Sequence, residues 1–236
     1  MFEKNKITAV ILAGGSGSRM AEAMPKQYLE IGAKPILNHS IDAFENAECI
    51  NEIILVVPCG QVEYCRQTIV EPGNYAKVTK IIEGGATRQE SSFKGILATD
   101  KANDFIMIHD GARPFVQAEE ISKMAKELTE KNALIMAVPV KDTIKKVSGG
   151  NVIEETLERK HLWAALTPQG FRRDSIIQAH EKALENGYQA TDDASLLEIM
   201  GQKVHIIEGS YMNIKITTKE DVVFGEAILA YRGSLS

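Results

Sequence analysis

The chain has 236 residues, of which 44% are hydrophobic and 25% are charged, and its net charge is −5. These values are ordinary for a globular protein with a full hydrophobic core. The negative charge argues against a general nucleic-acid-binding surface, and no run of about 20 apolar residues is present to span a membrane.

The cysteines and the start of the chain indicate a cellular compartment. Cys49, Cys59 and Cys65 are odd in number and lack the spacing of metal ligands, which is typical of a protein in a reducing cytosol. The first residues run almost directly into a predicted strand, so we expect no signal or transit peptide. The sequence thus predicts a cytoplasmic protein.

Strands and helices alternate through the first 140 residues. Apolar, β-branched runs predict buried strands at 7–12, 53–57, 78–82, 105–108 and 134–140. Apolar residues at helical spacing predict intervening helices at 35–44, 61–70, 91–97 and 119–131. This order predicts an α/β fold with a Rossmann-like, mostly parallel twisted sheet flanked by helices.

The pattern changes at residues 141–166. Two short strand-like runs, 141–147 and 151–157, flank the turn sequence Ser148-Gly149-Gly150. Such a hairpin has too little apolar surface for its own core, so we interpret it as a protruding β-hairpin dimerisation arm. The sequence therefore predicts one domain, 1–236, with the arm at 141–166, in a homodimer.

The last part of the chain returns to a mixed pattern. We expect helices at 174–186 and 192–200 and strands at 204–208 and 212–216. Thr217 and Glu220 have the spacing of a capping box, which predicts the start of a final helix that ends near Tyr231.

The loop after the first strand is rich in glycine and carries basic residues. It has the sequence Ala13-Gly14-Gly15-Ser16-Gly17-Ser18-Arg19-Met20, and Lys26 follows. Glycines allow an anion to approach the backbone closely, so the loop is typical of a polyphosphate cradle, with a flexible surface loop as the alternative. It is not a Walker A loop, and Met20 stands where a dinucleotide fingerprint needs glycine or alanine.

Two further predicted strands end in unusual polar loops. Residues 83–88 have the sequence Glu-Gly-Gly-Ala-Thr-Arg, and 109–114 have the sequence His-Asp-Gly-Ala-Arg-Pro. The carboxyl ends of parallel strands meet at one edge of the sheet, where ligands bind in open α/β sheets. We therefore expect one site shared among the three loops.

Five motifs together resemble the 2-C-methyl-D-erythritol 4-phosphate cytidylyltransferase family, within the sugar-phosphate nucleotidyltransferases. They are the loop from Ala13 to Met20 with Pro25-Lys26-Gln27, Gly84-Gly85 with Arg88 and Ser91, His109 to Pro114, Leu166 to Gln169, and Asn213 to Thr217. Their order matches that of the family across nearly the whole chain.

The resemblance implies a transferase that joins CTP to methylerythritol 4-phosphate with Mg²⁺ and releases pyrophosphate, in isoprene biosynthesis. The attacking group is a phosphate oxygen that is already anionic at neutral pH, so no side-chain base has to deprotonate it. The protein has to neutralise charge and position the reactants in line.

The resemblance also assigns roles to residues. It implies that Arg19, Lys26 and Lys215 are catalytic. The nucleotide would be bound by a larger group: Ala13, Gly14, Gly15, Gly17, Gly85, Ala86, Arg88, Ser91 and Asp110. Arg113, Thr143, Arg159 and Thr167 would bind the sugar phosphate, with Thr143 and Arg159 reaching the neighbouring subunit's site. Asp110 would lie near the metal, which the phosphates of CTP mainly hold.

Several of these residues also have a simpler structural interpretation. Asp110 could cap its turn, Arg113 could pair with a loop carboxylate, and Arg159 could form a surface ion pair of little energetic value with neighbouring glutamates. We expect His109 to be a hydrogen-bonded packing residue. Three positions depart from the family's pattern: Ala86 and Met212, where relatives often have an acidic residue, and Gly111, where they often have alanine.

Two alternatives of function remain at this stage. A ribitol 5-phosphate cytidylyltransferase shares most nucleotide-site motifs, although the pair Leu162-Trp163 before Thr167-Pro168-Gln169 favours methylerythritol phosphate. The alternative of another class is an inactive nucleotide-binding scaffold, and the presence of Arg19, Lys26 and Lys215 argues against it. A nicotinamide-dependent oxidoreductase is disfavoured by Met20.

Overall fold

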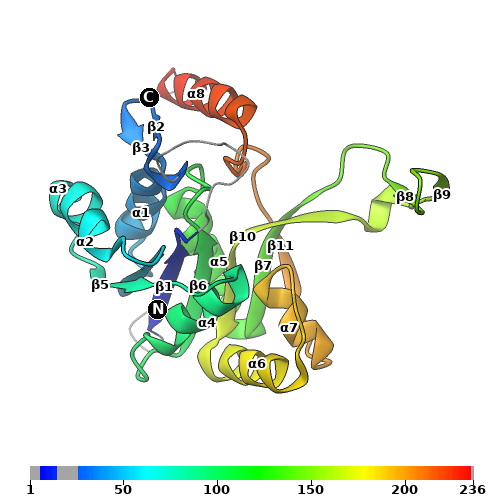
Figure 1. Cartoon of the computed structure of the whole chain (residues 1–236), viewed down its shortest axis with the longest axis horizontal. Helices are drawn as coiled ribbons and strands as arrows, with labels where there is room; N and C mark the ends of the chain where they lie inside the picture. The colour runs from blue at the N-terminus through cyan, green and yellow to red at the C-terminus, as the bar shows by residue number, and fades with distance from the viewer. Residues whose placement is uncertain (1–5, 15–25, 235–236) are drawn as a thin grey trace.

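A seven-stranded sheet forms the centre of the molecule (Figure 1), in a computed structural model that describes residues 6–14 and 26–234. The order across the sheet is β11-β7-β10-β6-β1-β4-β5. The strands are β1 (Ile7–Leu12), β4 (Glu52–Val57), β5 (Val78–Glu83), β6 (Phe105–Asp110), β7 (Ala133–Pro139), β10 (Trp163–Arg172) and β11 (His205–Glu208). Only β10 runs antiparallel to its neighbours within this sheet, which confirms the predicted mostly parallel α/β fold.

Helices cover both faces of the sheet. One face packs on α1 (Ile36–Asn46) and α5 (Ala118–Lys131), and the other packs on α4 (Arg88–Leu97), α6 (Arg173–Asn186) and α7 (Asp193–Ile199). Both layers are visible on either side of the strands in Figure 1. The sheet is therefore buried on two sides, as expected for parallel strands.

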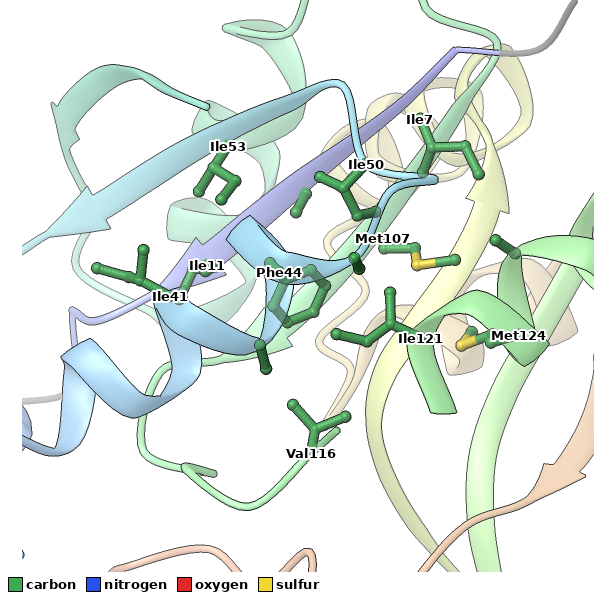
Figure 2. Close-up of a cluster of buried hydrophobic side chains, with 14 of the residues drawn as sticks. Ile7, Ile11, Ile41, Phe44, Ile50, Ile53, Met107, Val116, Ile121 and Met124 are labelled. Carbon is green, nitrogen blue, oxygen red and sulfur yellow. The ribbon is translucent and has the colours of Figure 1, made fainter. Parts of the chain in front are cut away.

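Strand β1 shows how the sequence produces this burial. Ile7 and Ile11 belong to the apolar cluster on the α1–α5 side, whereas Val10 belongs to the cluster on the α4–α6 side. Successive side chains of a strand point to opposite faces, so an unbroken apolar run supplies both cores at once. Figure 2 shows the first cluster, in which Phe44 of α1 lies among the isoleucines of β1 and its neighbours.

The remaining elements are short or terminal. They are β2 (Glu30–Ile31), β3 (Lys34–Pro35), α2 (Val62–Cys65), α3 (Glu71–Gly73), α8 (Lys219–Gly233), the 3₁₀ turns Lys26–Tyr28 and Arg159–His161, and the π-helical turn Arg66–Val70. The helical segment predicted at 61–70 thus continues to Gly73, because Pro72 lies in the first turn of α3, where proline is tolerated. No helix in the described ranges is long and apolar enough to cross a membrane.

The hairpin arm is present and projects away from the body of the molecule (Figure 1). Strands β8 (Lys145–Val147) and β9 (Ile153–Thr156) pair antiparallel, and every residue in them is exposed. Residues 163–165, which the sequence places in the arm, instead pair with β7 in the central sheet. The structure describes one chain, so the arm's role in a dimer stays a prediction.

Three further details differ from the sequence predictions. Strand β10 was not predicted, although it is the longest in the sheet. The strand predicted at 212–216 is wrong, because the segment is irregular and Ile216 donates one backbone bond of 2.8 Å to the Ala112 carbonyl. The final helix is capped by Thr218 with Asp221, one residue beyond the predicted pair.

Candidate active site

The three predicted loops meet at one edge of the sheet. Strands β1, β5 and β6 are parallel members of that sheet and end there. Gly111 donates a backbone hydrogen bond of 2.8 Å to the Leu12 carbonyl, which joins the first loop to the third. A Cβ atom at Gly14 would lie 3.6 Å from Ser91 Oγ, so the first loop begins close to the helix α4 that follows the second loop.

The second loop is folded tightly against the start of α4. Ser91 Oγ accepts a bond of 3.0 Å from the Gly85 N–H and donates one of 2.8 Å to the Thr87 carbonyl, while the Ala86 N–H donates to Glu90 Oε2 at 2.8 Å. A Cβ at Gly85 would lie 2.4 Å from Glu90 Cβ, which is a clash. Only glycine therefore allows this approach, and Ser91 shapes the loop from within the protein.

Asp110, at the end of β6, is surrounded by three basic side chains. Arg88 Nε lies 3.2 Å from Asp110 Oδ1, and Lys215 Nζ lies 2.7 Å from Oδ2. Arg113 Nε lies 3.8 Å from the same Oδ2. We call Asp110, Arg88, Arg113 and Lys215 the Asp110 cluster. Three cations around one carboxylate leave a net positive charge at the edge of the sheet where the glycine-rich loop begins.

The cluster keeps its carboxylate ionised. Burial acts to raise the pKa of Asp110, but Arg88, Lys215 and Arg113 outweigh it and hold that pKa below its usual range. For Arg88, burial acts to lower the pKa, whereas Asp193 and Asp110 raise it above its ordinary value. The carboxylate is therefore charged at neutral pH and unsuited to act as a general acid or base there.

Lys215 reaches the cluster although its segment is not a strand. Arg113 Nη1 donates a bond of 2.9 Å to the Asn213 carbonyl, and Asn213 Nδ2 donates one of 2.8 Å to the Thr167 carbonyl. Together with the backbone bond from Ile216, these contacts anchor the segment beside β6 and β10. The polar anchors explain how a lysine 105 residues along the chain comes to lie against Asp110.

His109 and Thr167 form a closed hydrogen-bond set under the cluster. His109 Nε2 lies 3.0 Å from the Arg113 carbonyl, and its Nδ1 lies 3.0 Å from Thr167 Oγ1, which also accepts from the Asp110 N–H at 3.1 Å. Burial lowers the pKa of His109 to about 4, so the ring is neutral at neutral pH. The Nε2–H therefore donates to the carbonyl and Nδ1 accepts from the threonine hydroxyl. His109 is confirmed as a hydrogen-bonded packing residue.

The structure does not bring every predicted site residue to this edge. Among the described residues, no hydrogen bond or ion pair joins Thr143 or Arg159 to the Asp110 cluster, and both lie in the arm segment that projects away (Figure 1). The Arg159 guanidinium donates to the Lys141 carbonyl, not to a neighbouring glutamate. Their predicted role toward a neighbouring subunit is compatible with this placement and stays a prediction.

Part of the predicted phosphate cradle lies outside the described residues. Gly15, Gly17 and Arg19 fall in the range 15–25, and for Lys26 only the backbone is described, in the 3₁₀ turn Lys26–Tyr28. Ala13 and Gly14 are described and lie at the sheet edge, where Ala13 N–H donates to the Val56 carbonyl at 2.7 Å. The roles assigned to these residues therefore stay predictions.

Local contacts account for two of the three positions that depart from the family pattern. A Cβ at Gly111 would lie 3.0 Å from Leu37 Cδ1 and 3.2 Å from the Leu12 carbonyl oxygen, so the glycine fills a tight position. The Ala86 backbone N–H is engaged by Glu90, and its side chain takes no part in that contact. Nothing in the structure explains Met212.

Sequence reasoning missed the residues behind the cluster. Asp193, at the start of α7, pairs with Arg88, and Ser92 and His180 donate to the same carboxylate. A weak signal was available, since Asp192-Asp193 directly precedes an apolar helical run. No group of three or more potential metal-ligating side chains occurs in residues 6–14 and 26–234. The arrangement as a whole is suited to holding a polyanion.

The chain is similar to one family of known proteins over almost its full length. A family model described as 2-C-methyl-D-erythritol 4-phosphate cytidylyltransferase matches residues 7–231. Proteins with that name from Caldanaerobacter subterraneus and Desulforamulus reducens are 46% and 44% identical to it. These matches span 223 and 226 residues, which are 94% and 96% of this chain and 98% and 97% of those proteins.

Solved structures give the same result. The crystal structure of 4-diphosphocytidyl-2C-methyl-D-erythritol synthase from Anaerococcus prevotii has a TM-score of 0.85 and 33% identity, and the match covers 97% of this chain and 98% of that one. The 2-C-methyl-D-erythritol 4-phosphate cytidylyltransferase of Thermus thermophilus has a TM-score of 0.77 and 28% identity, over 95% and 99% of the two chains.

Proposed function

Because the chain belongs to the 2-C-methyl-D-erythritol 4-phosphate cytidylyltransferase family, it transfers the cytidylyl group of CTP to methylerythritol 4-phosphate, and we propose that this reaction takes place at the Asp110 cluster. The observation that carries the proposal is one buried carboxylate held by Arg88, Arg113 and Lys215 at the edge where three loops meet. The two relatives described above are both named as enzymes that act on methylerythritol phosphate, which supports that substrate over ribitol phosphate and argues against an inactive scaffold.

In the reaction, an oxygen of the methylerythritol phosphate attacks the α-phosphorus of CTP. A phosphorus–oxygen bond forms there, the bond to the β-phosphate breaks, and pyrophosphate leaves with the electron pair. Lys215 has three N–H donors, and one of them bonds Asp110 at 2.7 Å. We propose that the other two contact the reacting phosphates, while Arg19 and Lys26 neutralise the triphosphate. Charge stabilisation of this kind is the main contribution a protein makes to phosphoryl-type transfer.

The second loop is proposed to bind the cytosine. The N–H groups of Gly85 and Ala86 are already engaged by Ser91 and Glu90. Among the described residues, no hydrogen bond reaches the carbonyls of Gly85 or Ala86. Carbonyl oxygens accept from the amino group that distinguishes cytosine from uracil, so the backbone alone supports a choice of base. Ala86 then needs no side-chain role.

Mg²⁺ is proposed as the cofactor, with Asp110 as its protein ligand. Mg²⁺ is usually bound through one or two carboxylates together with substrate phosphates, so a single ionised aspartate is a fitting donor set. When bound, the ion supplies charge neutralisation on the phosphates. Arg88 and Lys215 hold the carboxylate in place at the edge of the sheet.

A homodimer in the cytoplasm is the proposed form of the enzyme. The arm exposes apolar side chains that a single chain leaves uncovered, among them Val147, Val152 and Ile153, which are 52%, 62% and 59% exposed. Exposed apolar side chains on an otherwise polar hairpin favour packing on a partner. We propose that Thr143 and Arg159 complete the sugar-phosphate site of the neighbouring subunit.

A mixing experiment tests the shared site. Lys26→Ala and Arg159→Ala are each expected to be nearly inactive, because one lacks a triphosphate contact and the other lacks a contact from the arm. After the two variants are mixed and exchange subunits, half of the dimers are mixed and each carries one intact site. Turnover should then recover to about a quarter of the wild-type value, by the symmetry of a two-fold dimer.

A second pair of variants provides the control. Lys26→Ala mixed with Lys215→Ala places both changes in the body of the subunit, so no mixed dimer contains an intact site and no recovery is expected. Subunit exchange is checked with differently tagged chains. If tagged mixed dimers of the first pair form but turnover does not recover, the shared site is wrong.

A further inference from the structure

Asp193 is a buried carboxylate that the roles above leave unused. Its side chain is 1% exposed and accepts three hydrogen bonds: 2.8 Å from Arg88 Nη1, 2.5 Å from Ser92 Oγ and 3.1 Å from His180 Nε2. Burying an unpaired carboxylate is strongly unfavourable, so a charge kept at this depth requires such donors. The Asp193 carboxylate can stay ionised at this depth because Arg88, which lies at the edge of the active site, forms an ion pair with it.

Several elements hold Asp193 in a fixed place. Gln169 of β10 donates 2.8 Å from Nε2 to Asp192 Oδ2, and its Oε1 accepts from the Ala194 N–H at 3.2 Å. Gln169 itself pairs with Ile108 of β6, the strand that ends at Asp110. The start of α7 is thus fixed relative to the strand that carries the cluster.

His180 fixes the carboxylate from the opposite side. Its ring, on α6, stacks parallel on Phe93 of α4, with 5.1 Å between the ring centroids. Since Ser92 also belongs to α4, the helix that begins with Arg88 contacts Asp193 at two points. The Asp193 carboxylate is held by side chains of α4 and α6, and its neighbouring residues are held by β10, so it has little freedom to move with Arg88.

Arg88 lies between two carboxylates and is oriented by both. Its Nη1 contacts Asp193 at 2.8 Å and its Nε contacts Asp110 at 3.2 Å, so the shorter contact is to the more deeply buried group. The guanidinium is planar and rigid, and fixing one nitrogen on Asp193 fixes the direction of Nε toward Asp110. Without Asp193, Asp110 would be the one remaining hydrogen-bond partner of the guanidinium among the described residues.

We propose that Asp193 is a positioning residue for the cytidylyl transfer, which acts through Arg88 to hold the Asp110 carboxylate in its working orientation. The inference rests on the proposed role of the Asp110 cluster. Asp193 itself touches no substrate in this account. It also limits the positive charge of the site, because Arg88, Arg113 and Lys215 are balanced by two carboxylates instead of one.

The test is Asp193→Asn, which keeps the shape and removes the charge. We expect kcat to fall by about tenfold or more, the range seen when a group that orients a contact residue is lost. The KM for CTP should stay within about threefold, because no cation is removed from the site and the phosphates still meet Arg113 and Lys215. A merely structural role would instead raise KM and lower kcat together.

Two comparisons make the outcome decisive. When Arg88→Gln is already present, adding Asp193→Asn should lower kcat by less than about twofold further, because Asp193 acts through Arg88. Ser195→Ala, which removes a hydroxyl that bonds Asp192 in the same helical turn, should leave kcat unchanged even if the unfolding temperature falls. Three results would each overturn the inference. The first is that the losses of kcat in Arg88→Gln and Asp193→Asn multiply in the double variant, and the second is that kcat of Asp193→Asn stays within twofold of wild type. The third is that Ser195→Ala loses as much kcat as Asp193→Asn.

A readout without turnover separates this inference from the proposed function. The Arg88 Nε–H resonance, assigned by its loss in Arg88→Gln, should exchange slowly with water in the wild type and clearly faster in Asp193→Asn. An unchanged exchange rate would contradict the positioning role even if the enzyme is active. A wild-type protein that binds its substrates elsewhere would instead contradict the proposed site and leave the Arg88 result intact.

Discussion

Replacing Lys215 with alanine is expected to lower kcat by a factor of about 10²–10³, the usual effect of removing one preorganised charge donor from a transition state. Lys215 Nζ lies 2.7 Å from Asp110 Oδ2 and is aimed by a segment anchored on Arg113 and Thr167. Its loss removes a cation where negative charge builds up on the phosphates. Steady-state kinetics with CTP and methylerythritol 4-phosphate measures the change.

The fold should survive this substitution. Asp110 keeps its contacts with Arg88 and Arg113, so no buried charge is left alone. The matched control is Lys203→Ala, an exposed lysine before β11 at the opposite edge of the sheet, which should retain wild-type turnover. A Lys215→Ala variant that unfolds at the wild-type temperature and turns over at the wild-type rate would remove Lys215 from the mechanism.

Replacing Lys26 with alanine is expected to lower kcat at least as strongly, by about 10²–10³ or more. The motif Pro25-Lys26-Gln27 places this lysine after the glycine-rich loop, and the resemblance assigns it to the α-phosphate, where bonds form and break. Because the contact strengthens in the transition state, kcat should fall more than the affinity for CTP does. Single-turnover kinetics separates the two quantities.

An exposed lysine on α5 provides the comparison for Lys26. Lys123→Ala removes the same side chain from a solvent-facing position and should leave both kcat and the affinity for CTP unchanged. If Lys26→Ala lowers the affinity for CTP but leaves the single-turnover rate constant unchanged, its role is uniform binding of the nucleotide, and the assignment to the transition state is wrong.

The parallel part of the fold could be predicted because its signal is local. Strands β1, β4 and β6 are apolar runs buried on both faces, whereas β5 is a more exposed edge strand; each of the four begins and ends within two residues of its predicted bounds. A continuous apolar run bounded by polar loops leaves few other structures. The loops at the carboxyl ends of these strands followed from the same signal, and so did the placement of Asp110.

Strand β10 and the segment of Lys215 could not be predicted in the same way. The sequence around β10 contains Pro168 and Gln169, whereas residues 213–216 alternate polar and apolar as a strand does. The position beside β6 can hold only one strand, and β10 takes it, with register pairs such as Gln169 and Ile108. A segment forms a strand only where a neighbouring strand pairs with it, and the local sequence pattern does not indicate that neighbour.

The capping residue of α8 was missed for a related reason. Thr217 and Thr218 both precede acidic residues at the capping spacing, and Asp221 accepts from the backbone N–H groups of both threonines, at 2.7 Å and 2.8 Å. Both Thr217 with Glu220 and Thr218 with Asp221 have the spacing of a capping box, and the packing of the helix determines which pair forms it. Likewise, the role of Asp193 depends on the contact between α7 and α4, which the local sequence pattern does not indicate.

The central claim is the choice of substrates, and one assay tests it most directly. Purified protein is incubated with CTP, Mg²⁺ and either methylerythritol 4-phosphate or ribitol 5-phosphate, and pyrophosphate release is followed by a coupled enzyme. Turnover with methylerythritol 4-phosphate and background release with ribitol 5-phosphate is the predicted result. Turnover of ribitol 5-phosphate alone would contradict the account.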